Sequence, residues 1–147
     1  MKIYLASDHG GFKLKEKIEE HLHSKGLQVQ DLGPDKLDPT DDFPDFVVPL
    51  AKKVAVEKDS LGIVLCRNGV GVEIAANKVD GVRAALSWDP KHAASSRRDD
   101  NSNVIALPAD YLDENKAIEV LDAWLSTSYS KEPRFERRLK KIEEEEK

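Results

Sequence analysis

The stretch LGIVLCRNGVG, Leu61–Gly71, decides the fold of this sequence. Its apolar run shows no polar alternation, which favours a β-strand buried on both faces. The turn that follows carries Gly69 and Gly71, and glycine allows tight turning and close approach of the backbone to a ligand. The next segment, residues 70–79, resembles the start of a helix. We therefore predict a buried strand, a tight turn and a helix, with the single cysteine, Cys66, at the end of the strand.

Apolar runs alternate with amphipathic segments along the rest of the chain. The other predicted strands are residues 2–8, 27–33, 82–88 and 103–109. The other predicted helices are residues 10–26, 46–58, 89–100, 112–129 and about 132–146. We expect Gly26 to end the first helix, Pro49 to lie in the first turns of the second, and Asp89 to cap the helix that starts at Pro90.

This alternation predicts parallel strands joined by right-handed crossovers, with helices on both faces of the sheet. The predicted fold is a single doubly wound (Rossmann-like) α/β three-layer sandwich, with a central five-stranded parallel sheet and an extra C-terminal helix. A chain of 147 residues suits one domain with a real core, which we expect to span residues 1–147.

Composition narrows the class of protein further. The net charge is −5 with a pI near 5.4, so we expect no nucleic-acid partner, because such proteins usually present a basic face. One cysteine cannot form an internal disulfide. The apolar start IYLAS is too short for a signal peptide core or a membrane span. We therefore expect a cytoplasmic protein that does not insert into a membrane.

Ligands of doubly wound sheets bind beyond the carboxyl ends of the strands. Three predicted strand ends are therefore of interest: Ser7–Gly11, Cys66–Gly71 and Ser87–Asp89. Asp8 and His9 would place ionisable groups there, although Asp8 could equally be a helix cap and His9 simply exposed. The G-x-G-x-x-G fingerprint of dinucleotide-binding proteins is absent from the first turn.

The loop after Cys66 suggests a reactive thiol. Successive amides at the start of a helix form a nest that favours negative charge, and with Arg67 adjacent they should favour a thiolate. The alternative is a buried, inert cysteine, a common state of lone cysteines. A base beside such a cradle suits proton abstraction next to a carbonyl, and it also suits nucleophilic attack. The residues alone leave both reactions open.

Several motifs occur in one order along the chain. They are SDHGGFKLKEKI (7–18), DFPDF (42–46), CRNGVG (66–71), IAANKVDGVRAAL (74–86) and WLSTSY (124–129) before a pair of arginines. With these motifs the sequence resembles the type B ribose-5-phosphate isomerases and their galactose-6-phosphate isomerase relatives, nearly from end to end.

The resemblance implies aldose–ketose isomerisation of a sugar phosphate through a cis-enediolate, without a metal or an organic cofactor. Cys66 would be the base that moves the proton between C1 and C2, and Asp8 and His9 would contact sugar hydroxyls. The enediolate would be stabilised by the loop of Arg67, Asn68, Gly69, Val70 and Gly71. Arg134 and Arg138 match two phosphate-binding arginines of the family. The family's site lies between two subunits, so the resemblance implies a homodimer and leaves a tetramer open.

The chain departs from the family pattern along one wall of the expected site. The motif SRRDDNSNV places Asp99 where the family has the histidine assigned to ring opening, and Asp100 where it has asparagine. LPADYL places Asp110 at a usual arginine, and Phe43 replaces a tyrosine. Asp99 would need burial or a neighbouring carboxylate, such as Asp100, to serve as an acid at neutral pH.

Other side chains could take over these roles. His9 or His92 could open the ring in place of Asp99, and Arg67, Arg97 or Arg98 could compensate for the lost arginine. The favoured function is conversion of ribose 5-phosphate to ribulose 5-phosphate. The alternatives are isomerisation of a hexose or a non-phosphorylated sugar, and a non-catalytic sugar-phosphate-binding homologue. Covalent catalysis by Cys66 ranks lowest because no histidine partner is evident in the sequence.

Overall fold

A computed structural model describes residues 1–146, so Lys147, the last residue of the expected domain, lies outside the described residues. All strand pairs in the five-stranded sheet are parallel, and the strand order is β2-β1-β3-β5-β4. The strands are β1 (Lys2–Ser7), β2 (Gln28–Asp31), β3 (Ser60–Cys66), β4 (Ala84–Leu86) and β5 (Val104–Pro108). The helices are α1 (Phe12–Ser24), α2 (Pro44–Val56), α3 (Val70–Asn77), α4 (Pro90–Asp100), α5 (Glu114–Leu125) and α6 (Pro133–Glu143), with a short 3-10 turn, η1 (His9–Gly11), before α1.

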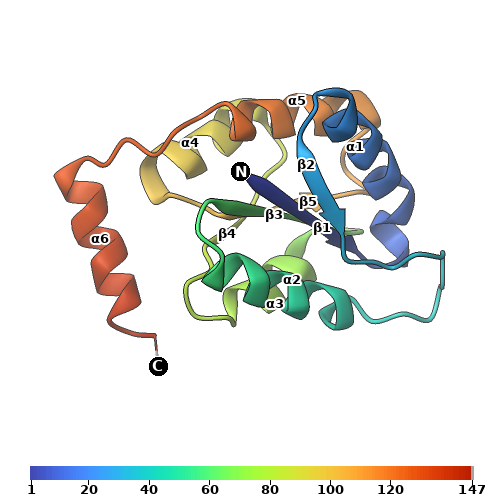
Figure 1. Cartoon of the computed structure of the whole chain (residues 1–147), viewed down its shortest axis with the longest axis horizontal. Helices are drawn as coiled ribbons and strands as arrows, with labels where there is room; N and C mark the ends of the chain where they lie inside the picture. The colour runs from blue at the N-terminus through green and yellow to red at the C-terminus, as the bar shows by residue number, and fades with distance from the viewer. Residues whose placement is uncertain (147) are drawn as a thin grey trace.

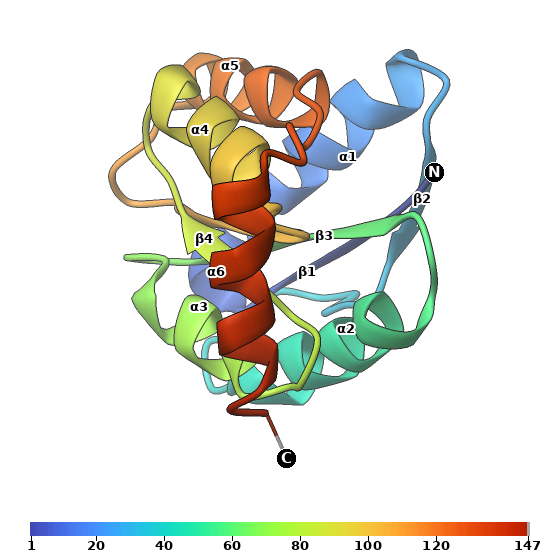
Figure 2. The ribbon, with the colours of Figure 1, turned by 90° about the vertical axis from the view of Figure 1, so that its left-hand side faces the viewer.

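Helices cover both faces of the sheet, as Figures 1 and 2 show. Alternate residues of the strands point to opposite faces. One set, which includes Leu5, Ile63 and Ile105, packs with α1, α4 and α5. The other set, which includes Ala6, Val64 and Ala106, packs with α2 and α3. The prediction of a doubly wound three-layer α/β fold is confirmed.

β3 is the central strand, and every one of its residues is buried. It pairs along its length with β1 on one side and with β5 on the other. The continuous apolar run that opened the sequence therefore forms the middle of the sheet, as expected. Because β1 and β3 end side by side, the residues that follow them meet at the carboxyl edge of the sheet.

β4 is one of the two edge strands of the sheet and is shorter than the predicted segment 82–88. Side chains of α3 bind its outward backbone groups: Leu86 N–H donates to Glu73 Oε1 at 3.0 Å, and Ala84 N–H donates to Asn77 Oδ1 at 2.8 Å. These contacts protect an edge that could otherwise pair with another strand. The strand ends where the chain turns toward Asp89, whose carboxylate caps α4 as predicted.

Two other helix boundaries test the sequence interpretation. Gly26 has a φ of 72° directly after α1, and Leu27 N–H donates to Leu22 O at 3.2 Å, so α1 ends as expected. Pro49 lies in the first turns of α2 as expected, but α2 starts two residues earlier than predicted, at Pro44. Because Pro44 occupies the first turn, Pro49 falls in the second turn, where its missing N–H removes a helical hydrogen bond.

α6, expected over about residues 132–146, forms over Pro133–Glu143 and stands beside the β4 edge of the sheet (Figure 2). It projects on the side where β1 begins, while β1 ends on the opposite side (Figure 1). Only Phe135 of its apolar stripe is buried, and Ile142 is 56 % exposed. No helix within residues 1–146 has the length and apolar character needed to cross a membrane.

We predict that Gly69→Ala is more damaging than Gly26→Ala. Both glycines have a positive φ, of 74° and 72°, so each substitution costs about 1–2 kcal/mol in backbone strain. A Cβ on Gly69 would also lie 2.6 Å from Leu86 Cδ1, whereas a Cβ on Gly26 has nothing within 4 Å. Overpacking should add about 1–3 kcal/mol to the loss at Gly69, measured by urea unfolding. Equal losses at the two positions would contradict this packing.

A second prediction concerns Asp122, which joins α5 to α1. Its Oδ1 lies 2.8 Å from His21 Nε2 and 2.9 Å from Lys25 Nζ. Burial alone would raise the pKa of Asp122, but hydrogen bonds from His21 and Lys25 hold this pKa below its ordinary value. A depressed carboxyl pKa contributes stability that is present above the unfolded pKa, near 4, and lost as the pH falls through the folded value.

Asp122→Asn should therefore lower the free energy of unfolding at pH 7, by no more than about 1 kcal/mol because the carboxylate is partly exposed. Thermal unfolding of both proteins from pH 7 to pH 2.5, roughly one unit or more below the unfolded carboxyl pKa, should show the difference vanishing at the acid end. Glu119→Gln, which removes an exposed pair with Lys116, is the matched control and should change little. A difference that grows toward low pH would contradict the assignment.

Candidate active site

Three chain segments converge at the carboxyl edge of the sheet. Asp8 N–H donates to Leu65 O at 3.3 Å, so the end of β1 is tied to the end of β3. A Cβ on Gly10 would lie 2.5 Å from Arg67 Cγ, so η1 packs directly against the loop after Cys66. Phe43, from the loop between β2 and α2, covers Gly71 with similar closeness. The expected meeting of the first and third strand ends is therefore present, and the loop after β2 adds a third wall.

Cys66 is the last residue of β3 and is 5 % exposed, with its side chain in the core beneath α2 and α3. It is a free cysteine. Its Sγ lies 3.7 Å from Asn68 Oδ1, and the same oxygen accepts the Val70 N–H at 3.0 Å. Asn68 therefore faces the thiol with its carbonyl oxygen and presents its NH₂ group as its donor. The thiol has both the burial of an inert cysteine and a polar contact at its tip.

The loop from Arg67 to Gly71 leads straight into α3. Gly69 adopts a left-handed conformation just before the helix, which turns the chain sharply after Asn68. The first N–H groups of a helix lack intrahelical acceptors. That of Val70 is taken by Asn68 Oδ1, and those that follow it in the first turn of α3 are available to an anion. Arg67 is exposed, and its Nη1 lies 3.6 Å from Asp110 Oδ2, which comes from the loop after β5. This pair bridges the ends of two neighbouring strands.

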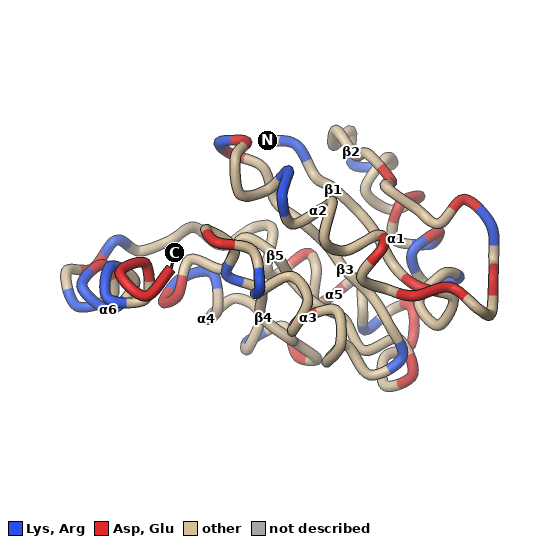
Figure 3. The backbone as a smooth tube through the Cα atoms, turned by 90° about the horizontal axis from the view of Figure 1, so that it is seen from below, with Lys and Arg blue, Asp and Glu red and all other residues tan. Residues whose placement is uncertain are grey.

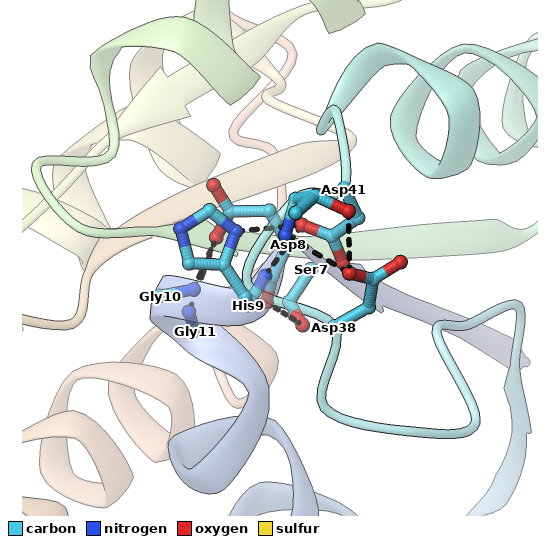
Figure 4. Close-up of polar contacts among 8 residues, drawn as sticks. Ser7, Asp8, His9, Gly10, Gly11, Asp38 and Asp41 are labelled. Atoms are coloured by element: carbon cyan, nitrogen blue, oxygen red, sulfur yellow. Dashed lines mark hydrogen bonds and ion pairs between the residues drawn. The ribbon is translucent and has the colours of Figure 1, made fainter.

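Asp8 caps the 3-10 turn. Its Oδ1 accepts the N–H groups of Gly10 at 2.8 Å and Gly11 at 3.2 Å, which matches the structural alternative considered from the sequence. His9 is not simply exposed, because its Nδ1 lies 2.7 Å from Asp41 Oδ1 (Figure 4). Asp41 was not singled out from the sequence. The pairing spans 32 residues and joins two loops, so only the aspartate-rich composition of the second loop could have hinted at it.

A buried lysine anchors the beginning of the loop that carries Asp41. Lys15 is 1 % exposed, and its Nζ contacts Asp31 and donates to Pro34 O at 3.0 Å. Asp31 in turn accepts the Gly33 N–H at 2.8 Å. The loop is strongly acidic, and Figure 3 shows its aspartates on the side of the molecule away from α6. This edge of the sheet is therefore held by polar contacts and is rich in negative charge.

Four of the predicted site residues lie away from Cys66 in the folded chain. α4 runs from the end of β4 back to the start of β5, which places Asp99 and Asp100 at the opposite edge of the sheet from Cys66. There Asp99 Oδ1 accepts a hydrogen bond from Arg98 Nε at 2.8 Å. Arg134 and Arg138 extend from α6, with both guanidinium groups over the Phe135 ring. Within one chain these residues are not brought together with Cys66.

The remaining histidine considered for ring opening, His92, lies in the first turn of α4. Its Nδ1 is 2.9 Å from the Oγ of buried Ser87, and its ring stacks on Trp88 with centroids 4.5 Å apart. Trp88 also lines a cavity of about 550 Å³ that includes Asn68, Tyr111 and Lys116. Residues 1–146 contain no cluster of three or more His, Cys, Asp or Glu side chains placed to hold a metal ion.

Comparison with known proteins gives one consistent result. The family model described as Ribose/Galactose Isomerase matches residues 3–142. A relative from Mycoplasma genitalium, named probable ribose-5-phosphate isomerase B, is 45 % identical over 141 residues, covering 95 % of this chain and 92 % of the relative. Ribose-5-phosphate isomerase B from Mycobacterium tuberculosis (strain H37Rv) is 39 % identical over 139 residues, covering 95 % and 86 %.

Solved structures agree with these relatives. Ribose-5-phosphate isomerase B from Mycoplasma genitalium with bound ribulose-5-phosphate superimposes with a TM-score of 0.94 at 44 % identity, covering 97 % of this chain and 94 % of that one. The type B ribose 5-phosphate isomerase of Trypanosoma cruzi gives a TM-score of 0.94 at 31 % identity, covering 99 % and 98 %. The end-to-end match in sequence and in fold shows that this chain belongs to the ribose/galactose isomerase family and is an aldose–ketose isomerase.

Proposed function

We propose that this protein interconverts ribose 5-phosphate and ribulose 5-phosphate, with Cys66 as the base. The observation that carries the proposal is the placement of Cys66 Sγ at the carboxyl edge, directly before a glycine turn and the start of α3. A relative whose structure contains bound ribulose-5-phosphate supports the substrate. The reaction needs one group that removes a proton from carbon and fixed donors for the charge that develops on oxygen.

The proposed step begins from the open-chain aldose. The Cys66 thiolate takes the proton from C2, the C2–H electron pair forms the C1=C2 bond, and the carbonyl oxygen on C1 becomes negative. The N–H groups at the start of α3 and the Asn68 NH₂ group stabilise this enediolate. The thiol then returns its proton to C1, while the hydroxyl proton on O2 passes to O1, and the ketose results.

A cysteine base is tested by isotope exchange. Ribose 5-phosphate in deuterated water should give ribulose 5-phosphate with deuterium at C1, and the reverse reaction should place deuterium at C2 of the aldose. Cys66→Ala should slow the exchange by about 10²–10⁴-fold, because it removes the proton carrier. Thermal unfolding of the variant checks that it is folded. Full turnover by folded Cys66→Ala would contradict the assignment.

The same experiment separates the competing functions. A panel of hexose phosphates and free aldoses, compared with ribose 5-phosphate, identifies the preferred sugar. Arg67 pairs with Asp110, so this cation of the carboxyl edge is already neutralised. The pair therefore supports including sugars that bind without a phosphate group. Binding of sugar phosphates without exchange of any of them would indicate a non-catalytic homologue instead.

We also propose that the working unit is a homodimer in which a second copy supplies Arg134 and Arg138. Within one chain these arginines lie away from Cys66, on the weakly packed helix α6. The carboxyl edge is acidic, with Asp8, Asp41 and Asp110 around the loop after β3. A phosphate dianion at this edge requires additional cations, and a symmetric dimer would bring them to both sites.

Subunit mixing tests this arrangement. Cys66→Ala and the double variant Arg134→Ala/Arg138→Ala should each be nearly inactive alone. Unfolding and refolding them together should restore about a quarter of wild-type activity, because half of the dimers then contain one intact site. Lys141→Ala, an exposed change on the same helix, is the control and should retain activity alone. A mixture no more active than its parts would rule out sites shared between subunits.

A further inference from the structure

We propose that His9, held by Asp41, is the acid–base group that opens the sugar ring in this protein. The inference rests on the proposed isomerase function and deepens it. Ribose 5-phosphate is mainly a closed hemiacetal, whereas proton transfer at C2 needs the open aldehyde. A group that opens the ring must therefore lie at the same edge of the sheet as the base.

Asp41 holds both the backbone and the ring of His9 through one oxygen. Asp41 Oδ1 accepts the His9 N–H at 3.0 Å and lies 2.7 Å from His9 Nδ1. A carboxylate only accepts hydrogen bonds, so Nδ1 carries a proton in this contact. The neutral ring then has its lone pair on Nε2, which points away from Asp41 in Figure 4. His9 is thus fixed as the tautomer that can take a proton at its outer nitrogen.

The burial of Asp41 sets it apart from the other aspartates of its loop. Its side chain is 6 % exposed, and its Oδ2 is buried without a hydrogen-bond donor among residues 1–146. Buried polar atoms without partners are uncommon in folded proteins, and each requires an explanation. An oriented histidine–carboxylate pair in a ligand crevice provides one, because the carboxylate stabilises the imidazolium that forms during proton transfer.

The position of His9 relative to Cys66 also fits. His9 lies between capped Asp8 and Gly10, and Gly10 packs on Arg67, the neighbour of Cys66. The His9 side chain is 25 % exposed, so it can reach both solvent and a bound sugar.

The charged side chains around His9 come from three elements: Asp8 of its own segment, Asp38 and Asp41 of the loop after β2, and Arg67 of the loop after β3. Hydrogen bonds from Thr40 hold the pKa of Asp38 below its ordinary value.

Ring opening by one imidazole is balanced in protons and electrons. His9 Nε2 takes the hydroxyl proton from O1 of the hemiacetal, and the O–H electron pair forms the C1=O1 carbonyl. The C1–O4 bond breaks, its electron pair stays on O4, and the imidazolium returns the proton to O4. No oxidant, reductant or metal is needed. Asp41 does not touch the sugar in this step and acts as a positioning residue.

The two rival groups are less well placed. Asp99 is held by Arg98 at the opposite edge of its own chain. His92 is packed between Trp88 and Ser87, and no carboxylate holds its Nδ1. Among the three candidates within residues 1–146, His9 combines a position beside the Cys66 loop with a buried carboxylate partner.

The test uses the difference between the two sugars. Ribulose 5-phosphate cannot close into a furanose, because its O5 carries the phosphate, so its conversion needs no ring opening. For His9→Ala, the rate with ribose 5-phosphate should stop rising with enzyme concentration once spontaneous ring opening becomes limiting. Its rate with ribulose 5-phosphate should remain proportional to enzyme. At high enzyme concentration the forward rate should lie about 10²-fold below that of the unmodified protein.

Each outcome of this test decides the question. The forward rate of His9→Ala could instead stay proportional to enzyme concentration and reach the wild-type level. That result would overturn this inference and leave the proposed isomerase function standing. A plateau in His92→Ala instead would assign ring opening to His92 and equally overturn it. Failure of the unmodified protein to convert either sugar would remove the isomerase function and this inference with it. His23→Ala, an exposed change on α1, is the control and should behave as wild type.

Asp41→Asn tests the positioning role separately. The variant should show the same forward plateau as His9→Ala while its KM for ribulose 5-phosphate is unchanged, because Asp41 does not bind the sugar. In ¹⁵N spectra, His9 should be protonated at Nδ1 in the unmodified protein and should become a mixture of tautomers in Asp41→Asn. Asp42→Asn, the exposed neighbour, is the matched control. An unaltered His9 spectrum with normal forward kinetics in folded Asp41→Asn would show that Asp41 does not position His9.

Discussion

The parallel pairing of β3 between β1 and β5 sets where every other part of the molecule lies. Ile63 of β3 lies opposite Leu5 and Ile105, and helices cover both faces of the ladder. Because the three strands run in one direction, the segments after β1 and β3 must leave the sheet at the same edge. The Cys66 loop, the η1 turn and the Arg67–Asp110 pair all follow from this arrangement. A strand buried on both faces thereby places its last residue at the carboxyl edge of the sheet.

The aspartates of the carboxyl edge and the arginines of α6 lie on opposite sides of the molecule. The loop after β2 concentrates aspartates at the carboxyl edge, where Lys15 anchors its beginning from within the core. Arg134 and Arg138 lie on α6, which projects from the other side. In the proposed function, a sugar phosphate takes its hydroxyl contacts from the first region and its cations from the second. The proposal of a shared site is a consequence of this separation, because a second copy can join what one chain keeps apart.

Much of the fold could be predicted from local patterns. The unbroken apolar run of β3, the αL glycine after α1 and the aspartate cap of α4 are short-range signals, and the structure has each of them. The start of α2 was predicted two residues late because Pro44, a good first-turn residue, lies outside the predicted segment. The β4 strand is shorter than predicted because it is an edge, and the α3 side chains that bind it come from a different part of the sequence.

The sequence by itself determined the α/β class, the glycine turn after Cys66 and the family, because these depend on residue patterns within short segments. Only the tertiary structure decided which polar side chains meet. The His9–Asp41 pair joins two loops 32 residues apart, and the Arg67–Asp110 pair joins the ends of two strands. It also placed Asp99 and Asp100 at the far end of α4 from the Cys66 edge. Such contacts depend on how the strands are ordered and how the loops pack over their ends, and no local pattern encodes that order.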